Sequence, residues 1–381
     1  MKRVAVLVKT DLKFDGRVIA EIDTLSRAFP SVEFKIFLLP DRAYENVLFS
    51  DNVTVELINV FTRKFKNKRQ LIVLTTLLYG FLTFYKLLKY KPNIVHVHDV
   101  FPIPGVYFYS LFSKVKLIYD DHELFKQNSD VFHKLLYQFE VNILRKAEIV
   151  LVANSYRKRI LVLLLRLNDQ KIVVLENYNH LRSFGQKTFN DQSLIDNFKR
   201  RKAQGERFIL HQGMVSEGRG VDYLVMIANA IPPNVRIIFM GISDTRYSDL
   251  TNIYPVLIDT SENIGFKPYE FINEYWAVMN GAIVLYDTKE INNKYCAPNR
   301  LYLALSNKIP LLVNKENPVL ASSVKLNNAG VSITKENLDI HLREFFTGIL
   351  NGSFYLDPDQ DFSFKNNSAP TLLTTYERLL F

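Results

Sequence analysis

A few carboxylates and a histidine in the first half of the chain are of the types that proton transfer and ligand binding require. Asp99 ends the apolar stretch NIVHVHD (93–99), and His122 and Glu123 end the stretch KLIYDDHE (116–123). A neutral histidine donates or accepts a hydrogen bond without a large pKa shift. All three are therefore candidate site residues. Packing at a strand end is the alternative for His122, and helix capping is the alternative for Glu123.

Two arginines lie beside glycines, a pattern that suits phosphate. Arg17 follows Gly16, and Arg219 lies between Gly218 and Gly220 before a predicted helix. A guanidinium group grips two phosphate oxygens at once, and the backbone N–H groups of such loops add further donors. Both arginines are candidate anion ligands, with a surface ion pair or a turn as the alternative.

The stretch YCAPNRLYLALSNKIPLLVN (295–314) places a polar corner before an apolar helix and a strand. Proline is favoured in a first helical turn, so Pro298 marks the helix start. The free N–H groups and partial positive charge of a helix start attract anions, and Arg300 adds a fixed charge. Asn299 and Arg300 are therefore candidate phosphate ligands, and a plain capped helix is the alternative. Cys296 is a lone thiol and gives little indication of a nucleophile.

Apolar runs alternate with helical stretches along the whole chain. In the first half, strands are expected at 4–9, 34–39, 53–60, 93–99, 116–123, 148–154 and 171–177, and helices at 15–29, 71–90, 131–147 and 156–166. In the second half, strands are expected at 207–213, 235–241, a short pair at 255–266, 281–287 and 310–314, and helices at 221–231, 268–280 and 298–306. Strands that are apolar throughout and separated by helices predict α/β architecture with parallel sheets covered on both faces.

The pattern restarts once, after a polar stretch. We therefore expect a first domain at 1–180, a linker at 181–206, a second domain at 207–365 and a C-terminal helix at 366–381. Both domains are expected to be doubly wound. Open parallel sheets bind ligands outside the carboxyl ends of their strands. Several singled-out residues fall at such ends: Asp99, His122, Glu123, Gly213 and Asp287.

The composition is that of a globular protein, with 48% apolar and 23% charged residues among 381. One cysteine excludes an internal disulfide framework and fits a reducing compartment. The apolar run near the N-terminus is too short for a signal peptide. The net charge of +9 suits nucleic acid, anionic lipid or phosphorylated small molecules, with a solvated basic face as the alternative. We find no nucleic-acid motif.

A basic cluster, RKFKNKR (63–69), precedes the apolar stretch 71–92. A spanning helix needs about 20 apolar residues, and only the first fifteen residues of this stretch are free of charge. We expect a buried or interfacial helix. A basic loop that leads into an apolar helix suits contact of 63–91 with an anionic membrane surface.

Six motifs occur in the order found in one enzyme group. They are FDGRVIAEIDTLS (14–26), NIVHVHD, LIYDDHELF, NYNH around Asn177, ILHQGMVSEGRGVDYLVMIA (209–228) and the Pro298–Asn299–Arg300 corner. Together they resemble the family 4-like group of glycosyltransferases, which have the GT-B fold, over nearly the whole chain. The resemblance implies two Rossmann-like domains that face a cleft, with the C-terminal helix returning to the first domain.

The resemblance also implies an activity. A hexose would move from a nucleoside-diphosphate sugar to a glycan or lipid-linked acceptor in cell-surface polysaccharide synthesis, with retention of configuration. Donor binding would fall to Gly16, Arg17, Gly213, Arg219, Asn299 and Arg300, and catalysis to Asp99, His122 and Glu123. No cofactor and no metal are expected, because basic side chains and helix dipoles neutralise the leaving diphosphate. The expected location is the cytoplasm, at the inner face of the cell membrane, without a nucleic-acid partner.

Two groups of residues have metal binding as an alternative. His96 and His98 alternate with apolar residues and share one strand face; we favour core or cleft-lining packing over a metal there. Asp120 and Asp121 resemble the metal-binding aspartate pair of a different glycosyltransferase fold. The GT-B interpretation argues against a metal at that pair.

The chain departs from the resembling family at one place. Where the family has two glutamates separated by seven residues, this chain has Tyr295 and Leu303. Leucine accepts no hydrogen bond from a ribose hydroxyl, and loss of such a buried partner costs about 1–3 kcal/mol. Glu290 is a candidate substitute. A catalytically impaired or scaffold member of the fold is therefore an alternative hypothesis.

Two further rivals come from other classes. A sugar-nucleotide epimerase of the same architecture would need carboxylate acid–base groups, and the sequence places no convincing set. A nucleic-acid binder would rest on net charge alone and would bind with strong salt dependence.

Overall fold

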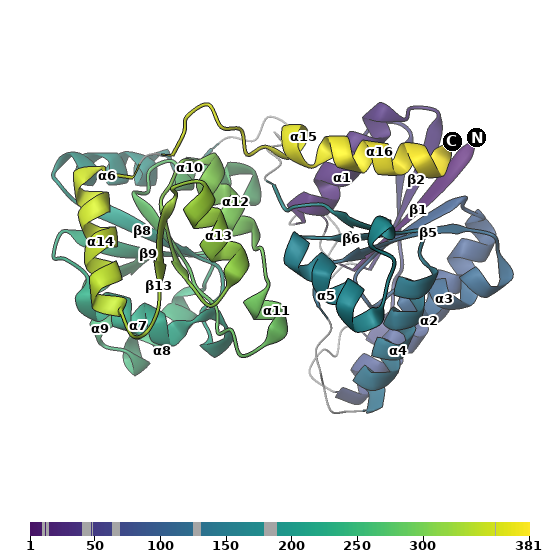
Figure 1. Cartoon of the computed structure of the whole chain (residues 1–381), viewed down its shortest axis with the longest axis horizontal. Helices are drawn as coiled ribbons and strands as arrows, with labels where there is room; N and C mark the ends of the chain where they lie inside the picture. Colours follow the sequence, from purple (N-terminus) through teal and green to yellow (C-terminus); the bar gives the residue numbers. More distant parts are fainter. Residues whose placement is uncertain are drawn as a thin grey trace. The chain divides into compact units, whose positions relative to one another are not determined.

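The computed structural model of the chain describes residues 1–9, 12, 15–39, 47, 49–62, 69–124, 131–178, 189–354 and 356–381. Residues 63–68 of the basic cluster at 63–69, and the first part of the expected linker, 181–188, lie outside the described residues. The chain divides into two compact units (Figure 1). Unit 1 comprises Met1–His180 with Phe364–Phe381, and unit 2 comprises Leu181–Ser363.

Unit 1 contains a parallel sheet of seven strands in the order β3-β2-β1-β4-β5-β6-β7. The strands are β1 (Lys2–Val8), β2 (Val32–Leu38), β3 (Val53–Leu57), β4 (Ile94–His98), β5 (Lys116–Asp121), β6 (Ile149–Val152) and β7 (Ile172–Val174). All residues of β4 and β6 are buried, as expected for apolar strands in the middle of a sheet covered on both faces.

The helices of unit 1 are α1 (Gly16–Ala28), α2 (Arg69–Tyr90), α3 (Ile103–Phe112), α4 (Val131–Lys146), α5 (Ser155–Leu165), η3 (Asp169–Lys171), α15 (Phe364–Asn367) and α16 (Ala369–Leu380). Helix α1 starts at a side-chain cap, because Asp15 accepts a hydrogen bond from the N–H of Val18. Helix α16 packs against α1 within unit 1 (Figure 1). The predicted return of the C-terminal helix to the first half of the chain is therefore confirmed.

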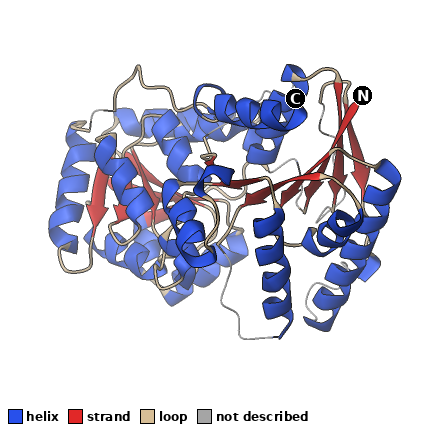
Figure 2. Cartoon of the chain, turned by 45° about the vertical axis from the view of Figure 1, so that its right-hand side comes forward, coloured by secondary structure: helices blue, strands red, loops and turns tan. Residues whose placement is uncertain are grey.

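Unit 2 contains a parallel sheet of six strands in the order β10-β9-β8-β11-β12-β13. The strands are β8 (Arg207–Gln212), β9 (Val235–Met240), β10 (Ser261–Asn263), β11 (Gly281–Val284), β12 (Leu311–Asn314) and β13 (Gly330–Ile333). The helices are α6 (Gln192–Ala203), η4 (Glu217–Arg219), α7 (Val221–Ala230), α8 (Asp244–Ile253), α9 (Val256–Thr260), η5 (Tyr269–Phe271), α10 (Ile272–Trp276), α11 (Ile291–Lys294), α12 (Asn299–Ser306), α13 (Pro318–Leu326) and α14 (Leu338–Asn351). Figure 2 shows strands with helices packed around them.

Several segments differ from the expected pattern. The stretch expected as the first strand of the pair at 255–266 forms helix α9 after Pro255, and only Ser261–Asn263 forms a strand. Proline favours the first turn of a helix and lacks the N–H that a strand ladder uses. The expected helix at 268–280 is divided into η5 and α10.

The described part of the expected linker contains helix α6. Its sequence is mostly polar, but Ile195 and Phe198 are buried. The ring of Phe198 packs against that of Phe208 on β8, with centroids 4.8 Å apart. Two apolar side chains three positions apart are enough to fix one face of a short helix.

In the part of the chain that the structure describes, no helix has the length and apolar character needed to cross a bilayer.

Candidate active site

Arg17 joins three parts of unit 1. Its Nε donates to Glu21 Oε1 at 3.0 Å within α1, its Nη2 to Asp120 Oδ1 at 2.6 Å at the end of β5, and its Nη1 to Asn177 Oδ1 at 2.5 Å beyond β7. Gly16 and Arg17 are both buried. The guanidinium group of Arg17 thus donates hydrogen bonds to two carboxylates and one amide of the protein. Its expected role in donor binding stays a prediction.

His122 and Asp99 are brought together, although 22 residues separate them in sequence. His122 Nε2 lies 3.2 Å from Asp120 Oδ2 and Nδ1 lies 3.7 Å from Asp99 Oδ1. Asp99 has φ 63°, a left-handed conformation that aspartate adopts more readily than most residues. It turns the chain directly after β4, and Glu123 beside His122 is exposed.

The charges around His122 change its expected state. Burial alone lowers the pKa of His122, but the carboxylates of Asp120 and Asp99 outweigh burial and raise the pKa to about 10. The sequence suggested a neutral imidazole, whereas the structure favours an imidazolium. Burial likewise raises the pKa of Asp120 on its own, but Arg17 and His122 hold it well below its usual value.

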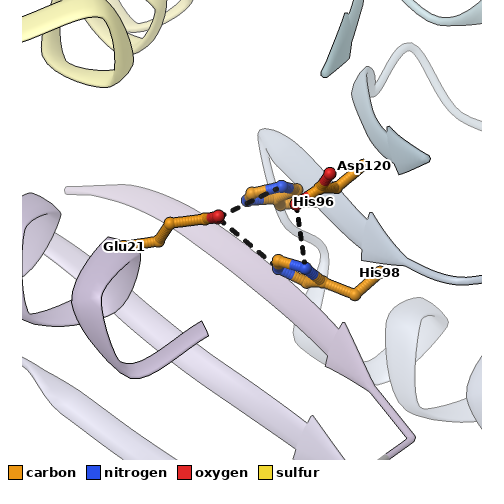
Figure 3. A group of neighbouring side chains, drawn as sticks. All are labelled: Glu21, His96, His98 and Asp120. Carbon is orange, nitrogen blue, oxygen red and sulfur yellow. Dashed lines mark ion pairs between the residues drawn. The ribbon is translucent and has the colours of Figure 1, made fainter. Parts of the chain in front are cut away.

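A second group of polar side chains lies beneath this one. Glu21, His96, His98 and Asp120 are all buried and gather at one place (Figure 3). The rings of His96 and His98 have centroids 4.3 Å apart, and His96 Nδ1 lies 2.8 Å from Tyr376 Oη on α16. Both histidines are therefore buried, and burial holds the pKa of His96 well below its usual value.

In unit 2, glycines shape the loop between β8 and α7. Gly213 follows β8 with φ 94°, and Gly220 precedes α7 with φ 70°. A Cβ atom on Gly220 would lie 2.9 Å from Leu285 Cβ. Gly220 is therefore needed both for its backbone conformation and for close approach to the segment after β11.

Two predicted arginines meet on one aromatic ring. The guanidinium carbons of Arg219 and Arg300 lie 5.1 and 5.0 Å from the centroid of Tyr286. Arg219 Nη1 donates to Tyr286 Oη at 2.8 Å, and Arg300 Nη1 donates to the carbonyl of Gln212 at 3.0 Å. Sequence reasoning missed Tyr286, although it directly precedes Asp287 at a predicted strand end.

Arg300 and the start of α12 both present unsatisfied donors. Arg300 is buried, and its Nη2 has no hydrogen-bond partner among the described residues. Helix α12 starts at the exposed Asn299, and no side chain caps it. Between the two sequence-based alternatives for this corner, the geometry offers donors to an anion rather than a side-chain cap.

The position of the expected second glutamate lies inside the unit. Leu303 is 1% exposed, as a residue of α12. Tyr295 is partly buried, and the Nζ of Lys294 lies over its ring, 5.8 Å from the ring centroid. Glu290 is exposed just before α11.

His211 on β8 is a buried histidine that sequence reasoning missed. Neither ring nitrogen makes a hydrogen bond of good geometry with the described residues, although the backbone of Met214 acts to raise the pKa of the ring. Burial, with a smaller contribution from the charge of Arg300, lowers the pKa of His211 to about 3. The apolar run that contains it predicts burial of the position but not its nearness to Arg300.

No known family profile and no curated protein sequence matches the chain. Solved structures do match it over nearly their whole length. WaaG, a glycosyltransferase involved in lipopolysaccharide biosynthesis, has a TM-score of 0.68 at 13% identity and covers 97% of this chain and 99% of its own.

Two further structures illustrate the range of proteins with this architecture. HepE from Anabaena, in complex with UDP, has a TM-score of 0.61 at 13% identity and covers 100% of this chain and 99% of its own. UDP-GlcNAc 2-epimerase from Methanocaldococcus jannaschii has a TM-score of 0.63 at 15% identity and covers 99% of both chains. Similarity at such low identity establishes architecture and leaves activity to the site. The chain has the GT-B fold of these glycosyltransferases, as its motifs predicted.

Proposed function

We propose that the protein is a glycosyltransferase that moves a sugar from a nucleoside-diphosphate sugar to a glycan or lipid-linked acceptor. The observation that carries the proposal is the arrangement of Arg219 and Arg300 around Tyr286 in unit 2, with the uncapped start of α12 in the same unit. Two of the similar structures support it, since WaaG is a glycosyltransferase and HepE binds UDP.

The donor site would work by electrostatics. A leaving nucleoside diphosphate gains negative charge as the glycosidic bond breaks, and fixed cations and N–H groups stabilise it. Arg300 is held by Gln212 and Tyr286, so its geometry is set before a ligand arrives. Its unpartnered Nη2 is costly to bury unless an acceptor reaches it, and a phosphate oxygen is such an acceptor. No catalytic metal is needed in this mechanism.

In unit 1, His122 and Asp99 would bind substrate hydroxyl groups. An imidazolium can donate a hydrogen bond to a hydroxyl group, and the carboxylate of Asp99 can accept one from a hydroxyl group. With a pKa raised to about 10, His122 is suited to donating a hydrogen bond or a proton rather than to acting as a base near neutral pH. We therefore propose a cationic rather than a neutral role for this histidine.

An epimerase is the second candidate, because the epimerase from Methanocaldococcus jannaschii has the same fold. Unit 1 does contain carboxyl groups with pKa values near neutrality: burial raises that of Asp121 to about 7 and that of Glu140 to about 8. Both are buried, and Glu140 accepts a hydrogen bond from Tyr119 Oη at 2.7 Å. Such enclosed groups do not offer acid–base chemistry to a substrate, so we favour transfer.

Contact with an anionic membrane is part of the proposal, as the location of a lipid-linked acceptor. Helix α2 exposes apolar side chains at helical spacing: Leu74, Leu77, Phe81, Tyr85 and Leu88. Helix α3, which packs against α2, exposes Phe108, Leu111 and Phe112. An apolar face preceded in sequence by the basic cluster RKFKNKR complements anionic lipid, which attracts lysine and arginine near its surface.

The donor site is tested by thermal unfolding against UDP, GDP, ADP, dTDP and CMP without metal. A ligand at a hundredfold excess over its Kd stabilises the folded state by about 2.7 kcal/mol, so one diphosphate should raise the Tm clearly. Arg219→Ala should abolish that shift, whereas Arg343→Ala, at an exposed arginine on α14 of the same unit, should keep it. If no nucleotide at millimolar concentration changes the Tm of the wild-type protein, the transferase proposal fails. Epimerisation of a radiolabelled nucleotide sugar in the absence of any acceptor would favour the epimerase instead.

The membrane face is tested by flotation with vesicles of phosphatidylglycerol and of phosphatidylcholine. Binding should require the anionic lipid and fall with salt. Phe81→Glu on α2 should reduce it, and Leu163→Glu, at an exposed leucine on α5, should not. Equal effects of the two substitutions would remove α2 from the proposal.

A further inference from the structure

Three buried atoms of unit 1 face one another without hydrogen-bond partners. They are Glu21 Oε2, His96 Nε2 and His98 Nε2, and none of them is satisfied by any described residue. Glu21 Oε2 lies 3.9 Å from His96 Nε2 and 4.0 Å from His98 Nε2. The three side chains are each 1% exposed. Figure 3 shows the carboxylate of Glu21 pointing at both rings.

The remaining atoms of these side chains are held by other partners. Glu21 Oε1 accepts from Arg17 Nε at 3.0 Å. His96 Nδ1 lies 2.8 Å from Tyr376 Oη. His98 Nδ1 lies 3.4 Å from Asp120 Oδ2 and 3.2 Å from His122 Nε2. Each side chain is thus fixed on one side and directs its other polar atom to the shared point.

A metal ion on His98 Nε2 would need the lone pair there and the ring proton on Nδ1. Asp120 Oδ2, 3.4 Å from His98 Nδ1, can accept that proton, because an ionised carboxylate only accepts hydrogen bonds. The lone pair of His98 Nε2 then faces Glu21 Oε2. At 4.0 Å the two atoms are too far apart for a direct hydrogen bond. Buried polar atoms without partners are costly, and a cation held between the three atoms would satisfy all of them.

We propose that Glu21, His96 and His98 bind a divalent transition-metal ion, with Zn²⁺ as the best fit. Imidazole nitrogen and carboxylate oxygen are common zinc ligands, and a ligating histidine usually gives its other nitrogen to a carboxylate or a similar group. Both histidines do so here, through Tyr376 and Asp120. Ligands at about 2.0–2.1 Å around a tetrahedral ion lie roughly 3.4 Å apart, so each of the two distances from Glu21 Oε2, 3.9 and 4.0 Å, would close by about half an ångström.

The ion would have a structural role. Glu21 belongs to α1, the two histidines to β4 and Tyr376 to α16, so the ion would tie α1 to the sheet and, through the ring of His96, hold α16 in place. Two cations lie beside this cluster: Arg17 keeps its carboxylate partners Glu21 and Asp120, and His122 keeps Asp120 and Asp99. Transfer in the proposed mechanism needs no metal, so this site stands apart from it.

The test uses the full chain, purified with its affinity tag removed. Metal is stripped with chelator, Zn²⁺ is returned by dialysis, and bound metal is counted by mass spectrometry. One ion per chain is expected, with a rise in Tm on loading. Reloading with Co²⁺ should give the intense visible absorption of a four-coordinate ion with nitrogen and oxygen ligands. This readout involves neither nucleotide nor sugar, so its failure is separate from failure of the transferase proposal.

Variants locate the ion. His98→Gln and Glu21→Gln, shown to be folded by circular dichroism, should lose the metal, and His133→Asn, at an exposed histidine on α4, should retain it. If the two variants fail to fold, the test rests on the wild-type protein, through its Co²⁺ spectrum and the number of metal ions bound per chain. Less than a tenth of an ion per chain after loading would overturn the proposal, and a bridging water would then satisfy the three atoms. Retention of the ion by a folded His98→Gln protein would overturn it as well.

Discussion

Arg17 and Asp120 lie 103 positions apart in sequence, yet Nη2 of Arg17 donates to Oδ1 of Asp120 at 2.6 Å. Their side chains are 8% and 0% exposed. This pair joins the first turn of α1 to the carboxyl end of β5. It also sets the charge of the whole cluster, because Asp120 in turn contacts His98 and His122.

Loss of Arg17 should be costly. Arg17→Gln leaves Asp120 and Glu21 buried without their cation, and breaking a buried pair in this way costs about 3–5 kcal/mol. Arg27→Gln on the same helix removes an arginine that pairs with Asp23 but is 67% exposed, so it should cost about 0–1 kcal/mol. Urea unfolding of both variants measures the difference. Equal losses would show that the Arg17–Asp120 pair contributes little.

The stability of unit 1 should depend on pH through His122. The pKa of His122 in the folded chain is about 10, above the ordinary value near 6.5, so the folded state binds the proton more tightly. The resulting stabilisation is complete below about pH 6.5 and is lost as pH rises toward 10. His122→Gln removes this contribution.

The measurement that checks this prediction is the difference in the free energy of unfolding between wild type and His122→Gln. Asp121 and Glu140, whose pKa values are raised to about 7 and 8, also make the free energy of unfolding fall as pH rises. The gap between wild type and His122→Gln should therefore be followed, and it should shrink between pH 6.5 and 10. A gap that stays constant would mean that His122 titrates normally.

His211 should reduce the stability of the folded chain at acidic pH. Its pKa of about 3 means that the folded state keeps the ring neutral while the unfolded chain binds a proton below about pH 6.5. Stability is then lost as pH falls from 6.5 toward 3, by about 2 kcal/mol at pH 5. In His211→Gln the loss between pH 7 and 5 should be smaller by that amount, and in His133→Asn it should match wild type. A wild-type slope in His211→Gln would contradict the assignment.

Gly220 should be intolerant of a side chain. Gly220→Ala strains a backbone with φ 70° and places a Cβ 2.9 Å from Leu285. Gly352→Ala is the matched control, because Gly352 has φ 64° and a Cβ there would meet nothing within 4 Å. Both should lose about 1–2 kcal/mol from the backbone. Gly220→Ala should lose about 1–3 kcal/mol more from overpacking, as measured by urea unfolding. Equal losses would show that Leu285 moves aside freely.

The sequence by itself determined the architecture and the edge at which the candidate site lies. Apolar strands such as NIVHVHD alternate with helices, and that pattern permits a parallel sheet covered on both faces and little else. It also predicts that Asp99 and His122 lie at the edge of the sheet where the carboxyl ends of the parallel strands meet, and the structure adds that their two strands are neighbours. Helix α6 was not predicted, because its sequence is mostly polar and its two buried apolar residues are too few to show a helical period.

Only the tertiary structure decided which partners each candidate residue has. Arg17 bonds to protein carboxylates, the carboxylates beside His122 favour its cationic form, and the ring of Tyr286 contacts both Arg219 and Arg300. The grouping of Glu21 with His96 and His98 also required the fold. Periodicity is a local property, whereas the charge and partners of a buried side chain depend on register and burial among residues a hundred or more positions apart.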